Sequence, residues 1–165
     1  MKVLEPSPAA VPMPNPEMVA LLDALIKLRQ GDASVRLPAH WVGLPGKVAD
    51  VFNDLVEKNG TMAAELARLR QVVGKEGKLK QRAVMPHAQG FWGESIESIN
   101  ALIDDLVHPT SEVARVIGAV AQGDLSKSMA LEVEGRELEG EFLRTAKTIN
   151  KMVEQLGNFS AGVTH

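Results

Sequence analysis

Apolar residues recur along most of the chain at alternating steps of three and four, the spacing of a coiled-coil seam. The first run predicts a helix that begins after Asn15 and ends before Gly31. Two longer runs predict helical rods, one of about 28 residues over 46–73 and one over 96–120 that Pro109 should kink. The last run is still present at the end of the sequence, so 158–165 is expected to start a continuing helix.

These seams define a predicted bundle core. A two-helix segment with one narrow apolar seam on each helix has little else to bury, so we expect the seams of four helices to meet. The predicted dimer or bundle core residues are Leu21, Leu25, Leu28, Val48, Phe52, Leu55, Met62, Leu66, Leu69, Ile96, Ile99, Ile103, Leu106, Val113, Ile117, Val120, Phe142, Ile149, Met152 and Leu156.

A repeat runs through the chain. Its helix-ending glycines, Gly31, Gly77 and Gly123, are 46 residues apart, and each is followed by a loop and by a helix with an apolar-Asn pair. These asparagines, Asn53, Asn100 and Asn150, stand 22, 23 and 27 residues after the glycine. The pattern predicts three units of helix, connector and helix at 17–60, 61–107 and 108–157. The proline-rich leader, 1–16, is expected to be disordered or extended.

The connectors cover 32–45, 78–93 and 124–140, and they contain too many apolar residues for fully solvated loops. We expect some of these side chains to lie in the grooves of the bundle. The apolar anchors of the first and third connectors are Leu37, Trp41, Val42, Leu44, Leu125, Met129, Leu131 and Val133.

Composition and charge limit the classes of partner and the location that we expect for the protein. The net charge is −3, basic residues are scattered and tyrosine is absent, so no nucleic-acid partner is indicated. There is no cysteine, no apolar segment of transmembrane length and no apolar run of a signal peptide at the start. We therefore expect a cytoplasmic protein that does not insert into a membrane.

No catalytic, cofactor or metal site is predicted. None of His40, His87, His108 and His165 forms a metal-ligand pair at helical spacing, and His108 lies before a proline in no recognisable phospho-acceptor sequence. A ligand site at the connector aromatics Trp41, Phe91 and Trp92 stays open as an alternative to groove packing. The carboxylates Glu132, Glu134, Glu137, Glu139 and Glu141 form a charge run typical of a solvated surface.

The third unit resembles the HAMP domain, a signal-relay module of bacterial receptors and histidine kinases. Pro109 fits the start of that family's first helix, and Gly123-Asp124-Leu125 fits the end of this helix. Glu141 fits the acidic residue that opens the second helix, nine residues before Asn150. The first two units have Leu44 and Phe91 at the acidic position and lack the matching proline. All three share a glycine ten residues before the asparagine, namely Gly43, Gly90 and Gly140.

The resemblance implies an all-α fold in which parallel homodimeric four-helix coiled-coil bundles stack end to end, with extended connectors along the outside. It implies a non-catalytic relay module without cofactors, controlling a downstream histidine kinase on the same chain. The sensory array of a chemoreceptor is an alternative. A third possibility, of another class, is a monomeric helical phosphotransfer or ligand-binding bundle.

The middle unit differs in phase from its neighbours. In the first and third units seam residues stand 10, 6 and 3 positions before the glycine, whereas in the second they stand 11, 8 and 4 positions before Gly77. The second helices differ similarly, because the seam steps around Ile99 are reversed relative to those around Phe52 and Ile149. This offset predicts that packing states alternate along the array.

Overall fold

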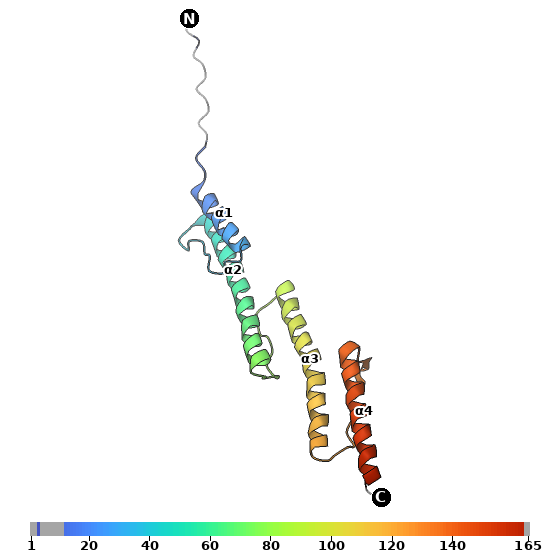
Figure 1. Ribbon diagram of the computed structural model, residues 1–165. Helices are drawn as coiled ribbons and strands as arrows, with labels where there is room; N and C mark the ends of the chain where they lie inside the picture. Colours follow the sequence, from blue (N-terminus) through green and yellow to red (C-terminus); the bar gives the residue numbers. More distant parts are fainter. Residues whose placement is uncertain (1–2, 4–11, 164–165) are drawn as a thin grey trace. The chain divides into compact units, whose positions relative to one another are not determined.

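The computed structural model describes residue 3 and residues 12–163 and is mostly helical. In chain order its elements are α1 (Pro16–Arg29), α2 (Gly43–Leu69), the π-helical turn η1 (Arg70–Lys75), α3 (Phe91–Ala121), β1 (Glu132–Val133), β2 (Arg136–Glu137) and α4 (Gly140–Val163) (Figure 1). The chain divides into two compact units, Met1–Gln71 and Val72–His165. Most of the predicted leader lies outside the described residues, and so does His165.

Helix α1 begins and ends where its sequence directs. The Asn15 side-chain oxygen accepts hydrogen bonds from the backbone N–H groups of Glu17 (2.9 Å) and Met18 (3.3 Å), so Asn15 is the N-cap of a helix that begins where it was predicted to. At the other end Gly31 adopts a φ of 87°, and the Asp32 N–H donates to the carbonyl of Lys27 at 3.0 Å. This left-handed ending satisfies helix carbonyls and turns the chain into the first connector.

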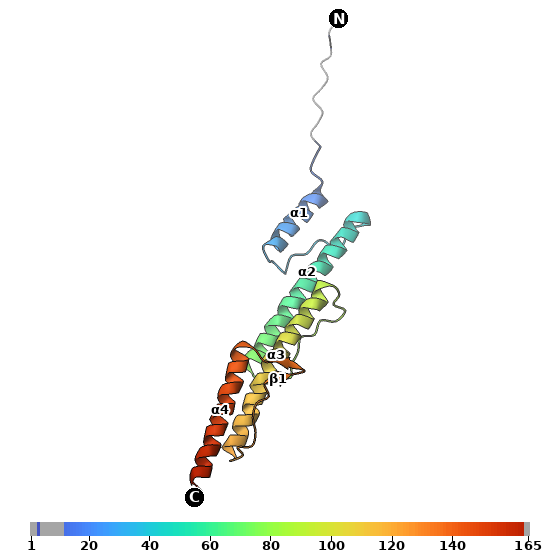
Figure 2. The same ribbon diagram turned by 90° about the vertical axis from the view of Figure 1, so that its right-hand side faces the viewer.

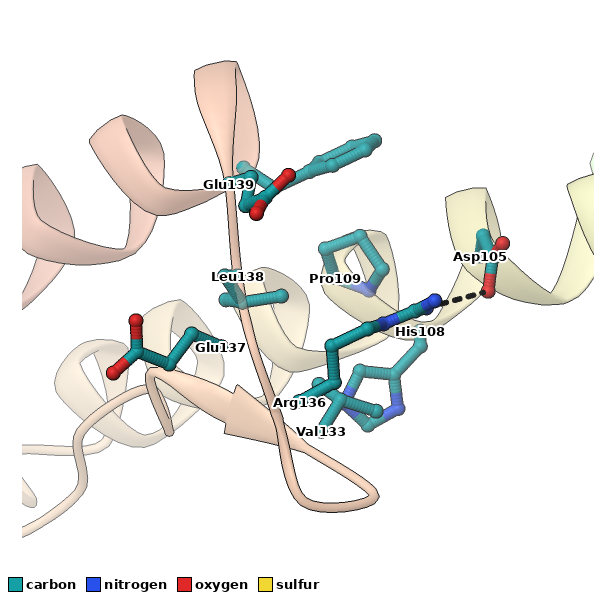
Figure 3. A pocket seen from close by; sticks show the side chains of 9 residues that line it. Asp105, His108, Pro109, Val133, Arg136, Glu137, Leu138 and Glu139 are labelled. Carbon is teal, nitrogen blue, oxygen red and sulfur yellow. Dashed lines mark ion pairs between the residues drawn. The ribbon is translucent and has the colours of Figure 1, made fainter.

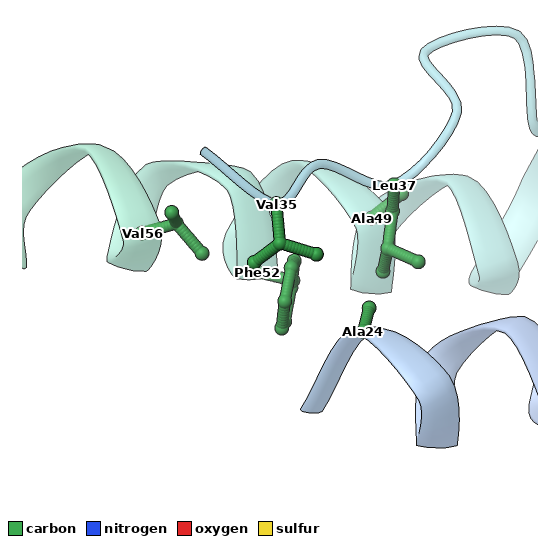
Figure 4. Packing of buried hydrophobic residues seen from close by; sticks show 6 residues of the cluster. All are labelled: Ala24, Val35, Leu37, Ala49, Phe52 and Val56. Carbon is green, nitrogen blue, oxygen red and sulfur yellow. The ribbon is translucent and has the colours of Figure 1, made fainter. Parts of the chain in front are cut away.

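The first compact unit has a small core between its two helices and its connector. Six residues are buried there (Figure 4). Leu21, Leu28 and Trp41 pack against them. The buried residues are Ala24 from α1, Val35 and Leu37 from the connector, and Ala49, Phe52 and Val56 from α2. The connector therefore lies along the helices, as the sequence predicts for its residue Leu37.

The second compact unit repeats this arrangement with α3 and α4, which run side by side (Figures 1 and 2). Its core contains Val116 from α3, Met129 from the connector, and Ala146 and Val153 from α4. Leu125 packs against this core, as does Leu138. Helix α3 continues through Pro109, which is buried. The predicted kink at that proline stays a prediction.

The third connector contains a short β-ribbon that was not predicted from the sequence. Strands β1 and β2 pair antiparallel, with Val133 opposite Arg136. The two residues between the strands, Glu134 and Gly135, both have positive φ angles (53° and 75°), which suit the right-handed twist of a two-residue hairpin. The ribbon accommodates the additional residues of the third connector, which is longer than the other two.

The predicted rod over 46–73 is observed as α2 followed directly by η1. Within it lie two glycines in different surroundings. A Cβ added at Gly46 would stand 2.4 Å from the carbonyl oxygen of Trp41, whereas one added at Gly60 would stand 3.9 Å from the Ala33 Cβ. Of these two positions, only 46 therefore requires glycine because of a close approach of the backbone.

We expect Gly46→Ala to destabilise the protein by about 1–3 kcal/mol, because the connector backbone must move away from the new methyl group. Gly60→Ala is the matched control and should stabilise the helix by about 0.5–1 kcal/mol. Urea unfolding followed by circular dichroism measures both changes. Equal effects of the two substitutions would contradict the proposed close approach at Gly46.

Candidate functional site

Each predicted asparagine binds a connector residue through both of its backbone polar groups. The Asn53 carboxamide accepts from the N–H of Leu37 at 2.8 Å and donates to its carbonyl at 3.0 Å. Asn100 makes the same pair with Ala83, at 2.7 and 3.0 Å. We call this paired hydrogen bond the asparagine clasp. It fixes an extended connector residue as a β-strand partner would, and it satisfies two backbone groups.

Asn150 makes the third clasp, with the N–H of Met129 at 2.7 Å and its carbonyl at 2.9 Å. In all three cases the clasped residue stands six positions after the helix-ending glycine. The glycine and the asparagine, two separate features of the sequence pattern, therefore form one structural device.

Arginines hold the connectors close to the clasps. The Arg36 guanidinium donates to the carbonyls of Ala33 (3.0 Å) and Val35 (2.7 Å). Arg82 occupies the equivalent position in the second connector and donates to the carbonyls of Leu79 (2.6 Å) and Gln81 (2.7 Å). In the third connector the donor comes from α3, where Arg115 binds the Ser128 carbonyl at 2.9 Å. These arginines were not predicted from the sequence as functional residues.

The first and third connectors begin with the same side-chain turn. Asp32 accepts from the Ser34 N–H at 2.8 Å, and Asp124 accepts from the Ser126 N–H at 2.9 Å. The serine hydroxyl of each turn donates to the same carboxylate and is the main reason that the pKa values of Asp32 and Asp124 lie below their ordinary values. The second connector has lysines at the matching positions, 78 and 80.

We expect this turn to make a pH-dependent contribution to stability. Because the folded-state pKa is lowered, the contribution is present above the unfolded pKa of about 4 and is lost as the pH falls through the folded value. We expect the double variant Ser34→Ala/Ser126→Ala to be less stable than the native chain at pH 7, with the difference shrinking below about pH 4. Urea unfolding from about pH 2.5 to 7 measures it, with Ser111→Ala as control. A difference independent of pH would contradict the assignment to the carboxylates.

Two adjacent apolar stripes on the helices differ in their solvent exposure. On α3, Val116 is fully buried against its own connector and α4, while the next residue, Ile117, is 47% exposed. On α1, Ala24 is 4% exposed and Leu25 is 45% exposed. The internal stripe thus forms the core of one chain. The second stripe, which includes Leu25 and Ile117, faces solvent, and we call it the open stripe.

The open stripe accounts for much of the predicted seam. Of the predicted core residues, Phe52 and Leu69 are buried. Those that are half-buried are Leu21, Leu28, Met62, Ile96, Ile99, Ile103, Val113, Val120, Ile149 and Met152. The exposed ones are Leu25, Val48, Leu55, Leu66, Leu106, Ile117, Phe142 and Leu156. Large apolar side chains left open at coiled-coil spacing are typical of a surface that another helix covers.

The residues of the internal stripe were missed as core positions. They stand beside the predicted seam and several are alanines, whose small side chains give a weak apolar signal. Alanine at these positions lets the connector backbone approach the helix closely. The missed residues are Ala24, Ala49, Val56, Val116, Ala146 and Val153, together with Val35 and Ala83 of the connectors.

An open groove lies where the β-ribbon meets the middle of α3 and the start of α4 (Figure 3). Arg136 approaches Asp105 at 3.8 Å, and His108, Pro109 and Phe142 line the same groove. Its charged side chains are exposed and of mixed sign. This is a solvated surface, and it contains no arrangement of nucleophile, base and oriented donor that would indicate catalysis.

The aromatic residues Trp41, Phe91 and Trp92 were the remaining candidates for a ligand site. Phe91 and Trp92 pack on each other with ring centroids 4.5 Å apart at the start of α3, and Phe91 is largely exposed. Trp41 packs on the first core. Among the described residues no group of three His, Cys, Asp or Glu side chains could hold a metal ion. Over the same residues, no helix combines the length and the apolarity that crossing a membrane requires.

Comparison with known proteins gives a family match for part of the chain. Residues 87–158 match the HAMP domain. The chain is 28% identical over 122 aligned positions to the methyl-accepting chemotaxis protein McpB of Pseudomonas aeruginosa, an alignment that covers 66% of this chain. The chain spans 18% of that relative's length. No solved structure matches the chain.

The match takes in α3, the third connector and α4, including Pro109, Gly123 and Asn150. These are residues on which the resemblance to HAMP domains was based. The match to one HAMP domain and the similarity to the chemotaxis relative together support a signal-relay role. HAMP domains and chemoreceptors of this kind are signalling modules that are generally not catalytic.

Proposed function

We propose that the chain is a non-catalytic relay module of three tandem HAMP units that works as a parallel homodimer. The observation that carries the proposal is the open stripe beside a buried one. One chain supplies two helices per unit and buries only their connector-facing stripes. A second copy supplies two further helices, and the open stripes then form the centre of a four-helix bundle.

The clasp geometry supports the tandem part of the proposal. The first two units lack the proline and the acidic residue found in the third, yet their asparagines bind the connector as Asn150 does. Equal offsets from glycine to clasped residue are what three copies of one module would have. A connector fastened in this way runs back along its helix, so the two helices that it joins are parallel.

A dimer of this kind transmits a signal through its packing. The helices of one unit continue into the next, as α2 and α3 do along their lengths. A change of packing at one end is then passed along continuous rods between arrangements of similar energy. Residues of the open stripe act here by packing against the partner.

The output domain belongs to the proposal too. A downstream histidine kinase and a chemoreceptor signalling region would both accept such an input. The relative is a methyl-accepting chemotaxis protein, while the relay role fits either output, so the kinase and the chemoreceptor both stay part of the proposal. The expectation of a cytoplasmic location is kept as part of the same proposal.

Sedimentation equilibrium over a concentration series tests the dimer. A mass of twice the chain mass of 17.8 kDa is expected. Parallel pairing is tested by Ile117→Cys in this cysteine-free chain, which should form a disulfide with its own copy under mild oxidation. A folded monomer at high concentration would overturn the proposal and bring a phosphotransfer or ligand-binding bundle forward.

A further inference from the structure

The helix that ends at Gly77 closes differently from the two that end at Gly31 and Gly123. At Gly31 the next N–H, that of Asp32, binds a carbonyl five residues back, and at Gly123 the N–H of Asp124 does the same. At Gly77 the N–H of Lys78 reaches Val72, six residues back, at 2.9 Å. The acceptor Val72 lies within the π-helical turn η1 (Arg70–Lys75). One extra residue is enclosed in the last turn of the middle unit's first helix.

Burial along these helices shows the same one-residue difference. The buried residues Ala24 and Val116 each stand seven positions before their glycine. In the middle unit the buried residue is Leu69, 6% exposed, and it stands eight positions before Gly77. The turn and the burial pattern are separate observations, and they give the same offset.

The sequence explains why the extra residue is placed in a π turn. With an ordinary α-helical ending at Gly77, the position seven residues before the glycine would be Arg70, and the position three before it would be Gly74. Burying an arginine without a partner costs far more than a turn of less regular hydrogen bonding. The π turn places Leu69 at the buried position instead, and Val73 is half-buried.

The second helices need no such correction. Each has an apolar residue that is buried or half-buried four positions before its asparagine, one before and three after. These are Ala49, Phe52 and Val56 in the first unit, Ile96, Ile99 and Ile103 in the second, and Ala146, Ile149 and Val153 in the third. The faces turned toward the connectors thus share one phase.

We infer that η1 is a register-compensating turn, a one-residue insertion that keeps the first helix of the middle unit in phase while its sequence is offset. The inference rests on the proposed tandem units. It also revises the predicted alternation, because the offset counted from Gly77 is taken up within the turn. The turn is then the place where this helix can change its register by one residue without releasing the asparagine clasp at Ala83.

Deletion of Gly74 in the full chain tests the inference. The deletion places Leu69 seven residues before the glycine, as in the other two units. The matched control is Gly74→Ala, whose added methyl group meets no atom within 4 Å and which keeps the residue count. Each background then receives one of three single substitutions, Arg68→Cys, Leu69→Cys or Arg70→Cys. The introduced thiol is labelled with a maleimide, and amide hydrogen exchange is followed over 70–78.

In all backgrounds the thiol of Leu69→Cys should react on the order of 10-fold more slowly than that of Arg68→Cys or Arg70→Cys, because position 69 stays buried. The deletion, unlike the alanine control, should also slow amide exchange over 70–78 by removing the π turn. Protection that moves to position 68 on deletion would overturn the inference, since the phase would then be set by distance from Gly77. The labelling pattern is measurable in a monomer or a dimer, so sedimentation of the same samples tests the proposed function separately.

Discussion

Asn150→Ala is expected to destabilise the α3–α4 unit by about 2–4 kcal/mol, because it leaves the N–H and carbonyl of Met129 without partners in a partly buried site. The connector residue Met129, 3% exposed in the native chain, would lose its fixed position over the core. Urea unfolding measures the change in free energy. Hydrogen exchange at the Met129 amide reports directly on the lost bond and should become much faster.

Asn150→Asp is the matched variant. Its carboxylate can accept from the Met129 N–H, but its second oxygen would face the Met129 carbonyl oxygen. We expect this repulsion in a partly buried site to raise the pKa of the carboxyl in the folded state. The penalty is therefore full above that pKa and is relieved as the pH falls through it, when the protonated acid can donate. The alanine variant should show no such recovery on acidification. An alanine variant within about 0.5 kcal/mol of the native chain, roughly the measurement error, would show that the clasp is not a stabilising element.

Ile117→Glu is expected to weaken dimerisation by on the order of 100-fold while leaving the fold of each chain intact. The side chain belongs to the open stripe, so a single chain hydrates the new carboxylate. In the proposed dimer two such carboxylates would be brought together in the bundle centre, one from each copy. Sedimentation equilibrium measures the dissociation constant, and circular dichroism checks the helical content.

Two neighbouring substitutions separate this effect from a general loss of stability. Ser111→Glu places the same charge on an exposed position of α3 that is turned about 120° from Ile117 around the helix axis, and it should leave association unchanged. Val116→Ala removes methyl groups from the internal core and should lower the unfolding free energy by about 1–3 kcal/mol with a smaller effect on association. If Ile117→Glu and Ser111→Glu behave alike, the open stripe is not the interface.

The sequence carries most of the information about where elements begin and end. Asn15 as a cap, the glycines that close helices and the asparagines of the second helices are single residues with specific backbone preferences, and each is found at its predicted place. The role of Asn53 could not be predicted, because its partner lies 16 residues away in a connector without regular structure. Such long-range pairs leave no periodicity in the sequence.

The internal stripe was missed for a physical reason. Coiled-coil spacing is recognised from large apolar residues, whereas the cores against the connectors also contain small ones such as Ala49 and Ala146. The members of the predicted seam therefore divide between buried, half-buried and open positions. Nothing in the local sequence separates Val116 from Ile117 until the connector is in place.

The β-ribbon and the π turn were missed because each contains residues that the equivalent segments of the other units lack. Glu134-Gly135 is not among the usual dipeptides of a two-residue hairpin, and the surrounding glutamates suggested only a solvated surface. An insertion in a helix is likewise invisible until its end is compared with those of equivalent helices. In the sequence this insertion is visible as the phase offset of the middle unit.

The clasped residue divides the segment between glycine and asparagine into a first part of constant length and a second part of variable length. From glycine to clasped residue the count is always six, whereas from clasped residue to asparagine it is 16, 17 and 21. The chain between Met129 and Asn150 is therefore a natural insertion site, and the tip of the ribbon at Glu134-Gly135 is an exposed point within it. An epitope tag or a small reporter domain grafted there would leave the helices in register, whereas one residue added between Gly123 and Met129 would not.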